Sequence, residues 1–140
     1  MQLKIKKTNP SAILPSYAYE DDAAFDLFSI VDITINPGEF KQIPTGIAMQ
    51  IPTGHVGLIW DKSSIAQKHG LKNLGGVVDS GYRGEVQVGL ANVGNDSYSI
   101  SKGQKVGQVI IQKKETCEIL EVDSLDDSDR GEGGFGSSGK

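Results

Sequence analysis

The sequence predicts an all-β fold, a sandwich or a barrel, with one short helix and a flexible C-terminal arm. Apolar and polar residues alternate in several short stretches, which is typical of strands with one buried face. Turn-forming stretches such as NPGE, PTG, VGND and SKGQ separate these stretches at spacings that suit an all-β fold. The chain contains no repeat of the length found in solenoids.

Alternation marks the predicted strands along the chain. Successive residues of a strand point to opposite sides of the sheet, so the apolar side chains of each stretch share one face. We expect these faces to be buried. The residues that define them are Leu3 and Ile5; Val31, Ile33 and Ile35; Ile47, Met49 and Ile51; Val56, Leu58 and Trp60; and Val86, Val88 and Leu90.

The stretch SSIAQKHG predicts a helix of one or two turns that begins near Lys62 and Ser63. We expect Ser64 as the N-cap, Gln67 three residues later to complete a capping box, and Gly70 as the stop. Unpaired N–H groups at a helix N-terminus favour anions, so the start of this helix is also a candidate phosphate site. An ordinary capped turn explains the same residues.

The stretch GGVVDSGYRG places Asp79 between an apolar run and a glycine-rich turn. The following residues, EVQVGLAN, alternate like a strand, so we expect Asp79 at the mouth of a β-hairpin. A carboxylate at this position is either a turn cap or a catalytic base.

Charge is distributed unevenly along the chain. Residues 1–117 carry 12 Lys and Arg against 11 Asp and Glu, whereas residues 118–140 carry 2 against 7. A protein that binds duplex DNA needs a basic face to neutralise phosphates, so we expect no nucleic-acid partner. A small phosphorylated ligand is compatible with this balance.

The size of the chain, 140 residues of which 37% are hydrophobic, suits one globular domain. It has no apolar run that could span a bilayer and no signal-peptide core, so we expect a cytoplasmic protein without a membrane partner. One cysteine, Cys117, and two histidines, His55 and His69, form neither a disulfide framework nor a Cys/His zinc cluster. Any metal ion would therefore bind oxygen ligands.

The last twenty residues are poor in apolar groups and rich in Gly, Ser and Asp, which predicts a flexible arm. Phe135 indicates a function for it, because a lone aromatic ring among glycines is useful when it packs on a surface such as a nucleobase. The glycines neither follow a strand nor open a helix, which excludes a dinucleotide or P-loop site. Groups suited to phosphate are the guanidinium of Arg130 and the hydroxyls of Ser137 and Ser138.

Five stretches, in order, resemble the five motifs of trimeric deoxyuridine triphosphatases (dUTPases). The resemblance implies a jelly-roll-like domain over residues 1–120, an arm over 121–140, and a homotrimer with active sites between subunits. It also implies Mg²⁺-assisted cleavage of dUTP to dUMP and pyrophosphate, which limits uracil in DNA and supplies dUMP for thymidylate synthesis. The stretches are AAFDLFS (23–29), DKSSIA (61–66), GGVVDSGYRGEVQV (75–88), GQKVGQV (103–109) and RGEGGFGSSG (130–139).

The resemblance implies a role for each motif residue. Asp79 would be the general base that activates the attacking water. Tyr82 would pack under the deoxyribose, where a 2′-hydroxyl would clash. Asn73 and the backbone around Gly76 would pair with the uracil edge.

The resemblance assigns other residues to the phosphates. Ser63 would donate near the scissile bond, and Lys62 and the N–H of Ser64 would lie beside it. Gln108 would contact the phosphate chain, and Asp26 would support the metal through water. In the arm, Arg130, Ser137 and Ser138 would hold the β- and γ-phosphates with Gly136 beside them, and Phe135 would stack on the uracil.

Four residues depart from the family pattern. Lys62 and Lys105 stand where arginines are usual, and a lysine keeps the charge but loses the bidentate fork. Ser64 and Ala24 stand where glycine is frequent.

Two alternative functions are compatible with the same fold. A dCTP deaminase would need a catalytic glutamate where this chain has Gly89, and without it proton transfer to the amino group has no agent. A regulatory protein that binds dUTP without hydrolysing it would have no need of a base at Asp79. Pyrophosphate release distinguishes these alternatives from hydrolysis.

Overall fold

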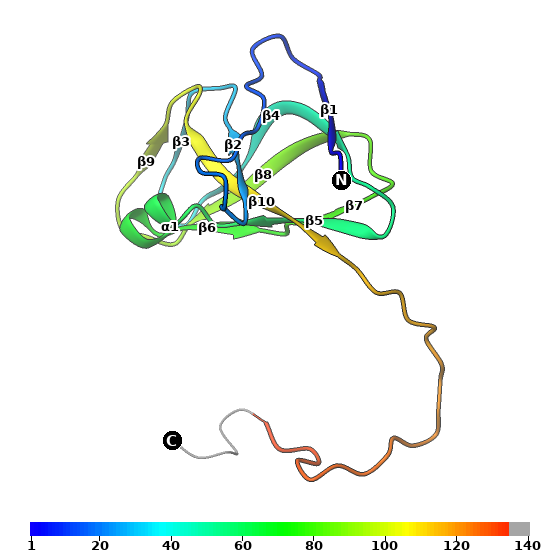
Figure 1. Cartoon of the computed structure of the whole chain (residues 1–140). Coiled ribbons are helices and arrows are strands. Elements are labelled where there is room, and N and C mark those ends of the chain that lie inside the picture. Colours follow the sequence, from blue (N-terminus) through cyan, green and yellow to red (C-terminus); the bar gives the residue numbers. More distant parts are fainter. Residues whose placement is uncertain (135–140) are drawn as a thin grey trace.

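Antiparallel strands build nearly the whole fold, as the sequence predicts. The computed structural model describes residues 1–134, which form two four-stranded sheets, one two-stranded sheet and one short helix. The two larger sheets face each other across the apolar core (Figure 1), and neither closes into a barrel within this range. The fold is therefore a jelly-roll-like sandwich.

The first large sheet has the order β1 (Lys4–Lys7), β4 (Phe40–Gln50), β8 (Glu85–Asn92) and β6 (Leu71–Leu74). Its neighbouring strands are antiparallel. The alternation predicted for β8 is confirmed, because Val86, Val88 and Leu90 are all buried. In β4, Ile47 and Met49 are buried in the same core.

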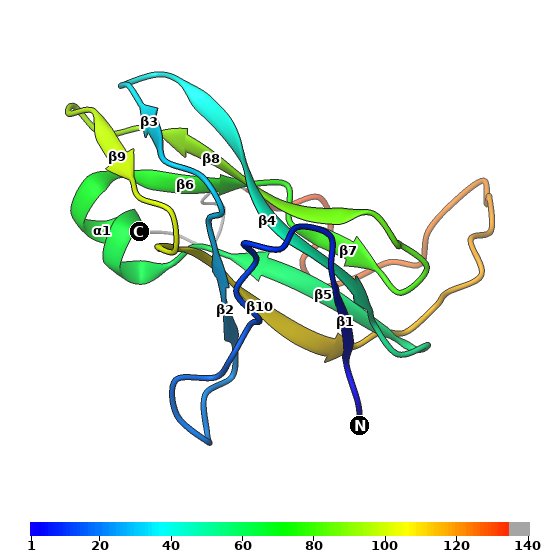
Figure 2. The ribbon, with the colours of Figure 1, turned by 90° about the horizontal axis from the view of Figure 1, so that it is seen from above.

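The second large sheet has the order β2 (Phe25–Phe28), β10 (Lys105–Lys113), β5 (His55–Trp60) and β7 (Val77–Asp79). The short strands β3 (Ile33–Ile35) and β9 (Tyr98–Ile100) pair at one end of the sandwich (Figure 2). The helix α1 (Ser63–His69) connects β5 with β6 near the same end.

The burial predicted for β5 is wrong. Gly57 and Ile59 are its buried residues, and Trp60 is 52% exposed. A Cβ at position 57 would come within 2.7 Å of the Ile51 Cδ1 atom, so a larger residue there would need the end of the Ile51 side chain to move. The residues predicted for the core lie on the other face of β5: Val56, Leu58 and Trp60.

The capping box predicted for α1 is also wrong, although the helix itself and its end are confirmed. The N-cap is Lys62, with extended backbone and no side-chain capping bond, so Ser64 lies inside the first turn. Gly70 ends the helix with a φ of 71°. Burial of Ile65, which is 4% exposed, sets the phase of the helix and outweighs the preference of Ser64 for a cap.

The β-hairpin predicted around Asp79 does not form. β7 pairs with β5, whereas β8 pairs with β4 and β6, so the turn between β7 and β8 links two different sheets. The chain changes sheets at Gly75 and Gly76, which have φ values of 76° and 116°. Such values favour glycine and interrupt a strand.

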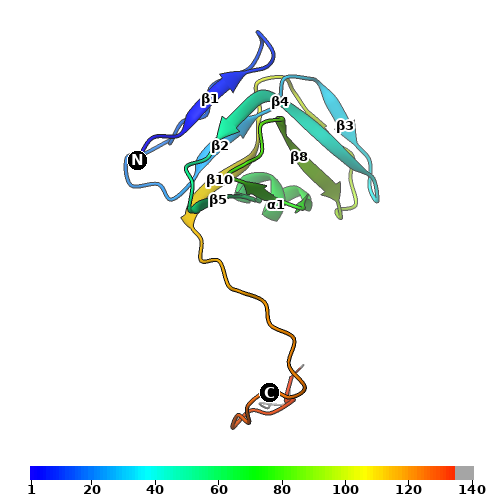
Figure 3. The same cartoon turned by 90° about the vertical axis from the view of Figure 1, so that its right-hand side faces the viewer.

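The segment after β10 leads away from the sandwich (Figure 3), and residues 114–134 contain neither helix nor strand. Four apolar side chains of this segment are exposed: Ile119, Leu120, Val122 and Leu125. The domain boundary after residue 120 and the flexibility of the arm stay predictions. Among the described residues, no helix is long and apolar enough to cross a membrane.

Candidate active site

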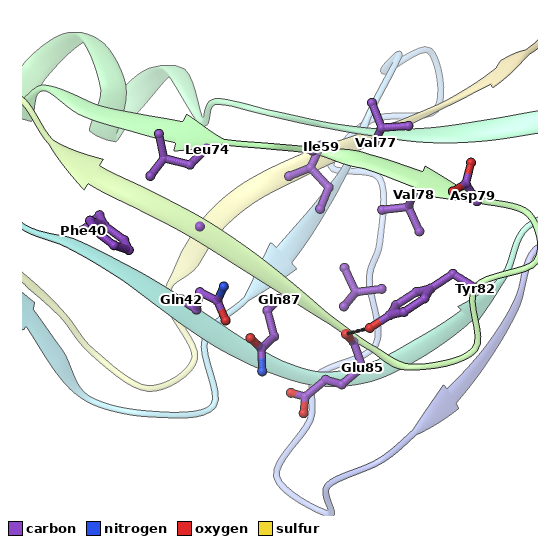
Figure 4. A pocket seen from close by; sticks show the side chains of 13 residues that line it. Phe40, Gln42, Ile59, Leu74, Val77, Val78, Asp79, Tyr82, Glu85 and Gln87 are labelled. Atoms are coloured by element: carbon purple, nitrogen blue, oxygen red, sulfur yellow. Dashed lines mark hydrogen bonds between the residues drawn. The ribbon is translucent and has the colours of Figure 1, made fainter.

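A pocket of about 580 Å³ lies where β7 and β8 separate (Figure 4). Three of the predicted site residues line it: Gly76, Asp79 and Tyr82. Its other lining residues are Phe40, Gln42, Ile59, Leu74, Val77, Val78, Glu85, Val86, Gln87 and Gly89.

Asp79 is the last residue of β7 and is exposed at the pocket. Within residues 1–134, no hydrogen bond or ion pair engages its carboxylate, while its carbonyl accepts the N–H of Tyr82 at 3.1 Å. Both carboxylate oxygens are therefore free of contacts with residues 1–134, and the hydrogen-bonded turn from Asp79 to Tyr82 keeps these two residues close in space.

Tyr82 points into the pocket with its ring partly exposed. Its hydroxyl donates to the carbonyl of Glu85 at 3.0 Å, the dashed line of Figure 4. The ring lies over Gly84, where a Cβ would overlap its atoms. A flat aromatic face is thus held at one end of the pocket, close to Asp79.

Asn73, on β6, does not line this pocket but lines a second one of about 210 Å³, which shares Ile59, Gly76 and Val77 with the first. Its side-chain amide donates to the carbonyls of Ile59 at 3.0 Å and Gly75 at 3.4 Å. Its Oδ1 atom is buried without a hydrogen-bond partner among the described residues. Gly76 packs against this amide, since a Cβ on it would lie 2.9 Å from the Asn73 Nδ2 atom.

The residues predicted for the phosphates form a second group outside the pocket lining. Asp26, 3% exposed on β2, accepts from Lys62 Nζ and Lys105 Nζ, both at 2.6 Å. Burial raises the pKa of Asp26, but hydrogen bonds from Lys105 and Lys62 and their charges outweigh burial and hold it below the usual value of 3.8. Both carboxylate oxygens are engaged, and the predicted support of a metal by Asp26 stays a prediction.

The remaining residues of this group lie at the start of α1 and on β10. Ser63 and Ser64 are exposed in the first turn of the helix. Gln108 donates from Nε2 to the carbonyl of Asp61 at 2.8 Å, which attaches the segment before α1 to the sheet. Their contacts with phosphates stay predictions.

The arm residue Arg130 is exposed, and its Nε atom donates to the carbonyl of Gly133 at 2.7 Å. Along residues 1–134, no three His, Cys, Asp or Glu side chains gather into a metal site. The other arm residues predicted to bind the substrate lie outside the described residues: Phe135, Gly136, Ser137 and Ser138.

Several pocket residues were missed by the sequence reasoning. Gln87 and Gly89 of β8 could have been found, because the buried Val86, Val88 and Leu90 leave the intervening residues facing the other way. Phe40 and Gln42 carry no such signal, because only the pairing of β4 with β8 brings them into the same pocket as Asp79.

The all-β sandwich of this chain is similar in fold to solved structures of a known family. A dUTPase family model matches residues 10–139, so the chain belongs to the dUTPase family. The deoxyuridine 5'-triphosphate nucleotidohydrolases of Nautilia profundicola and Clostridium kluyveri are each 46% identical, over 100% and 99% of both chains. The Staphylococcus bacteriophage 80alpha dUTPase with dUPNHPP superposes with a TM-score of 0.92, at 29% identity over 99% of both chains.

Replacing Asp26 by Asn should lower the free energy of unfolding by about 2 kcal/mol at neutral pH, because two ammonium groups lose their shared counter-charge. The pKa of Asp26 is lower in the folded protein than in the unfolded chain. The carboxylate therefore stabilises the fold at pH values above its pKa in the unfolded chain. This contribution is lost as the pH falls through its pKa in the folded protein. Urea unfolding over a pH series should therefore show the gap closing below pH 3.8. Asp21→Asn, at an exposed carboxylate, is the control, and a gap that is constant with pH would contradict the prediction.

Proposed function

We propose that this protein hydrolyses dUTP to dUMP and pyrophosphate, with Asp79 as the general base. The observation that carries the proposal is the convergence of Gly76, Asp79 and Tyr82 in one pocket of a chain that belongs to the dUTPase family. The reaction would limit uracil in DNA and supply dUMP for thymidylate synthesis. We place it in the cytoplasm, where a nucleotide pool provides the substrate.

The chemistry at the α-phosphorus needs a base because neutral water is a poor nucleophile. The carboxylate of Asp79 is exposed and unpaired within residues 1–134, so it can take the proton as water attacks. Tyr82 would pack under the deoxyribose and leave no room for a 2′-hydroxyl. The buried Asn73 Oδ1 atom, which lacks a donor among the described residues, supports recognition of an N–H on the uracil edge.

The proposed reaction also requires Mg²⁺. The described residues offer scattered carboxylates rather than a cage, which suits an ion held largely by the oxygens of the triphosphate. Such an ion would offset the negative charge of the phosphates.

The active sites would be shared within a homotrimer. One chain keeps Asp79 and Tyr82 in the pocket, while Asp26, Lys62 and Lys105 lie outside its lining. Exposed apolar side chains around the pocket, Phe40 at 67% and Val77 at 70%, support burial against a second copy. The exposed apolar residues after β10 support an arm that packs on another subunit.

The deaminase alternative finds no support at the pocket. A Cβ on Gly89 would lie 3.0 Å from the carbonyl oxygen of Leu74, so the position that would need a glutamate is crowded by backbone. A regulatory protein that only binds dUTP is separated from the proposal by pyrophosphate release.

Asp79→Asn should keep the fold and much of the affinity for dUTP but lose turnover by about 10² to 10⁴, because the amide cannot accept a proton. Steady-state pyrophosphate release and binding of the analogue dUPNHPP measure the two properties separately. Asp96→Asn, at an exposed carboxylate outside the pocket lining, is the matched control. Activity within a few-fold of the parent would make Asp79 a turn residue only.

Removal of divalent cations should stop hydrolysis, because the charge of the triphosphate would no longer be offset. Turnover of dUTP is measured in excess EDTA and again after Mg²⁺ is restored. Unchanged turnover in EDTA would refute the metal requirement.

Mixed trimers test whether the arm crosses between subunits. Full-length chains with Asp79→Asn are dissociated and reassembled with chains that end before Arg130. Some mixed trimers then combine an intact Asp79 from one chain with an intact arm from another, so activity should return although both parents are weak. Verified mixed trimers that stay as inactive as both parents would show that each arm serves its own subunit.

A further inference from the structure

Hydrogen bonds to residues before and after Tyr82 in the chain fix the turn in which it lies. Before it, the carbonyl of Asp79 accepts its N–H at 3.1 Å. After it, the Nη1 atom of Arg83 donates to the carbonyls of Ser80 at 2.7 Å and Tyr82 at 2.8 Å. Its hydroxyl is held by the carbonyl of Glu85, so the position of the ring depends on where the backbone of Glu85 lies (Figure 4).

The strand ladder alone leaves this part of β8 weakly fixed. β4 and β8 pair regularly from Phe40 to Pro44, but the register shifts between Pro44 and Ala48, where Ala48 pairs with Glu85. The extra residues of β4 bulge at this point, and a bulge disrupts the ladder locally. The first residues of β8 therefore need other contacts to be held.

Side chains supply these contacts. One oxygen of the Glu85 carboxylate accepts the N–H of Gly46 at 2.8 Å, and the buried Thr45 hydroxyl donates to the carbonyl of Val86. Gly46 itself is held, because its carbonyl accepts the N–H groups of Thr8 at 2.8 Å and Asn9 at 3.2 Å, and the side chains of Ala12 and Asn9 pack closely around it. The Glu85 carboxylate thus attaches the start of β8 to a rigid point of β4.

We propose that Glu85 is a positioning residue for sugar discrimination: its carboxylate bonds to Gly46 and thereby fixes the carbonyl that holds the Tyr82 hydroxyl. The inference rests on the proposed function, in which Tyr82 packs under the deoxyribose. When the carboxylate is lost, the start of β8 moves more freely, the ring can shift, and a 2′-hydroxyl is admitted. Glu85 acts through Tyr82 and takes no part in proton transfer.

The test compares Glu85→Ala with Glu85→Gln, because glutamine keeps an oxygen that can accept the Gly46 N–H. The ratio of kcat/KM for dUTP to that for UTP should fall about tenfold in Glu85→Ala, as expected for loss of a charged hydrogen bond, and stay near the parent value in Glu85→Gln. Tyr82→Ala sets the full size of the effect. Hydrogen exchange at the Gly46 amide, which should be faster in Glu85→Ala alone, reports the bond independently of activity.

Glu39→Ala is the matched control. The Glu39 carboxylate also accepts a backbone N–H, that of Asn36 at 3.1 Å, but in a turn that does not line the pocket. Its loss should leave the ratio unchanged. An equal fall in kcat/KM for dUTP and UTP in Glu85→Ala would mean a structural role only and would overturn the inference, as would an equal effect of alanine and glutamine at position 85.

The experiment also distinguishes failure of the proposed function from failure of the inference about Glu85. In that case the parent protein does not release pyrophosphate from dUTP or does not prefer it to UTP. If the parent prefers dUTP and Glu85→Ala keeps the whole preference while the Gly46 amide exchanges faster, only the inference about Glu85 is wrong.

Discussion

The backbone crossing at Gly75 and Gly76 is the constraint on which the pocket depends. At Gly76 both conformation and space require glycine, because φ is 116° and a Cβ would lie 2.6 Å from the carbonyl oxygen of Ile59. The crossing lets β6 pair with β8 in one sheet and β7 pair with β5 in the other. The edges of β7 and β8 therefore part, and Asp79 stands at the resulting opening. A continuous strand through positions 71–79 would close the gap.

Polar contacts of Asp61 fix the start of β6, just before the crossing at Gly75 and Gly76. Asp61 accepts the N–H of Asn73 and the ammonium of Lys72, both at 2.5 Å, while its carbonyl accepts from Gln108. These bonds join the segment before α1 to β6 and β10. The Gln108 side chain and the Asn73 backbone N–H therefore hold the scaffold in this chain, whatever these residues contact in a complex.

The single chain leaves apolar surface that its own fold does not cover. β5 is buried on one face through Gly57 and Ile59, yet its other face ends in the half-exposed Trp60. Val77 of the adjacent β7 and the residues after β10 are exposed as well. Apolar surface exposed to water favours association, so these surfaces of the sandwich and of the segment after β10 are suited to contact with other subunits.

By itself, the sequence determined the all-β class, the inward faces of β4 and β8, the end of α1 at Gly70, and Asp79 and Tyr82 as site candidates. Alternation and glycine conformation are local, because they depend on neighbours along the chain, whereas Tyr82 follows from the resemblance of five motifs along the whole chain. Only the tertiary structure decided that β7 leaves β8, that β5 buries Gly57 and Ile59, and that Asp26 holds two lysines. Each of these features depends on residues that are far apart in the sequence. Their packing and pairing override local preference, so no short stretch of sequence could predict them.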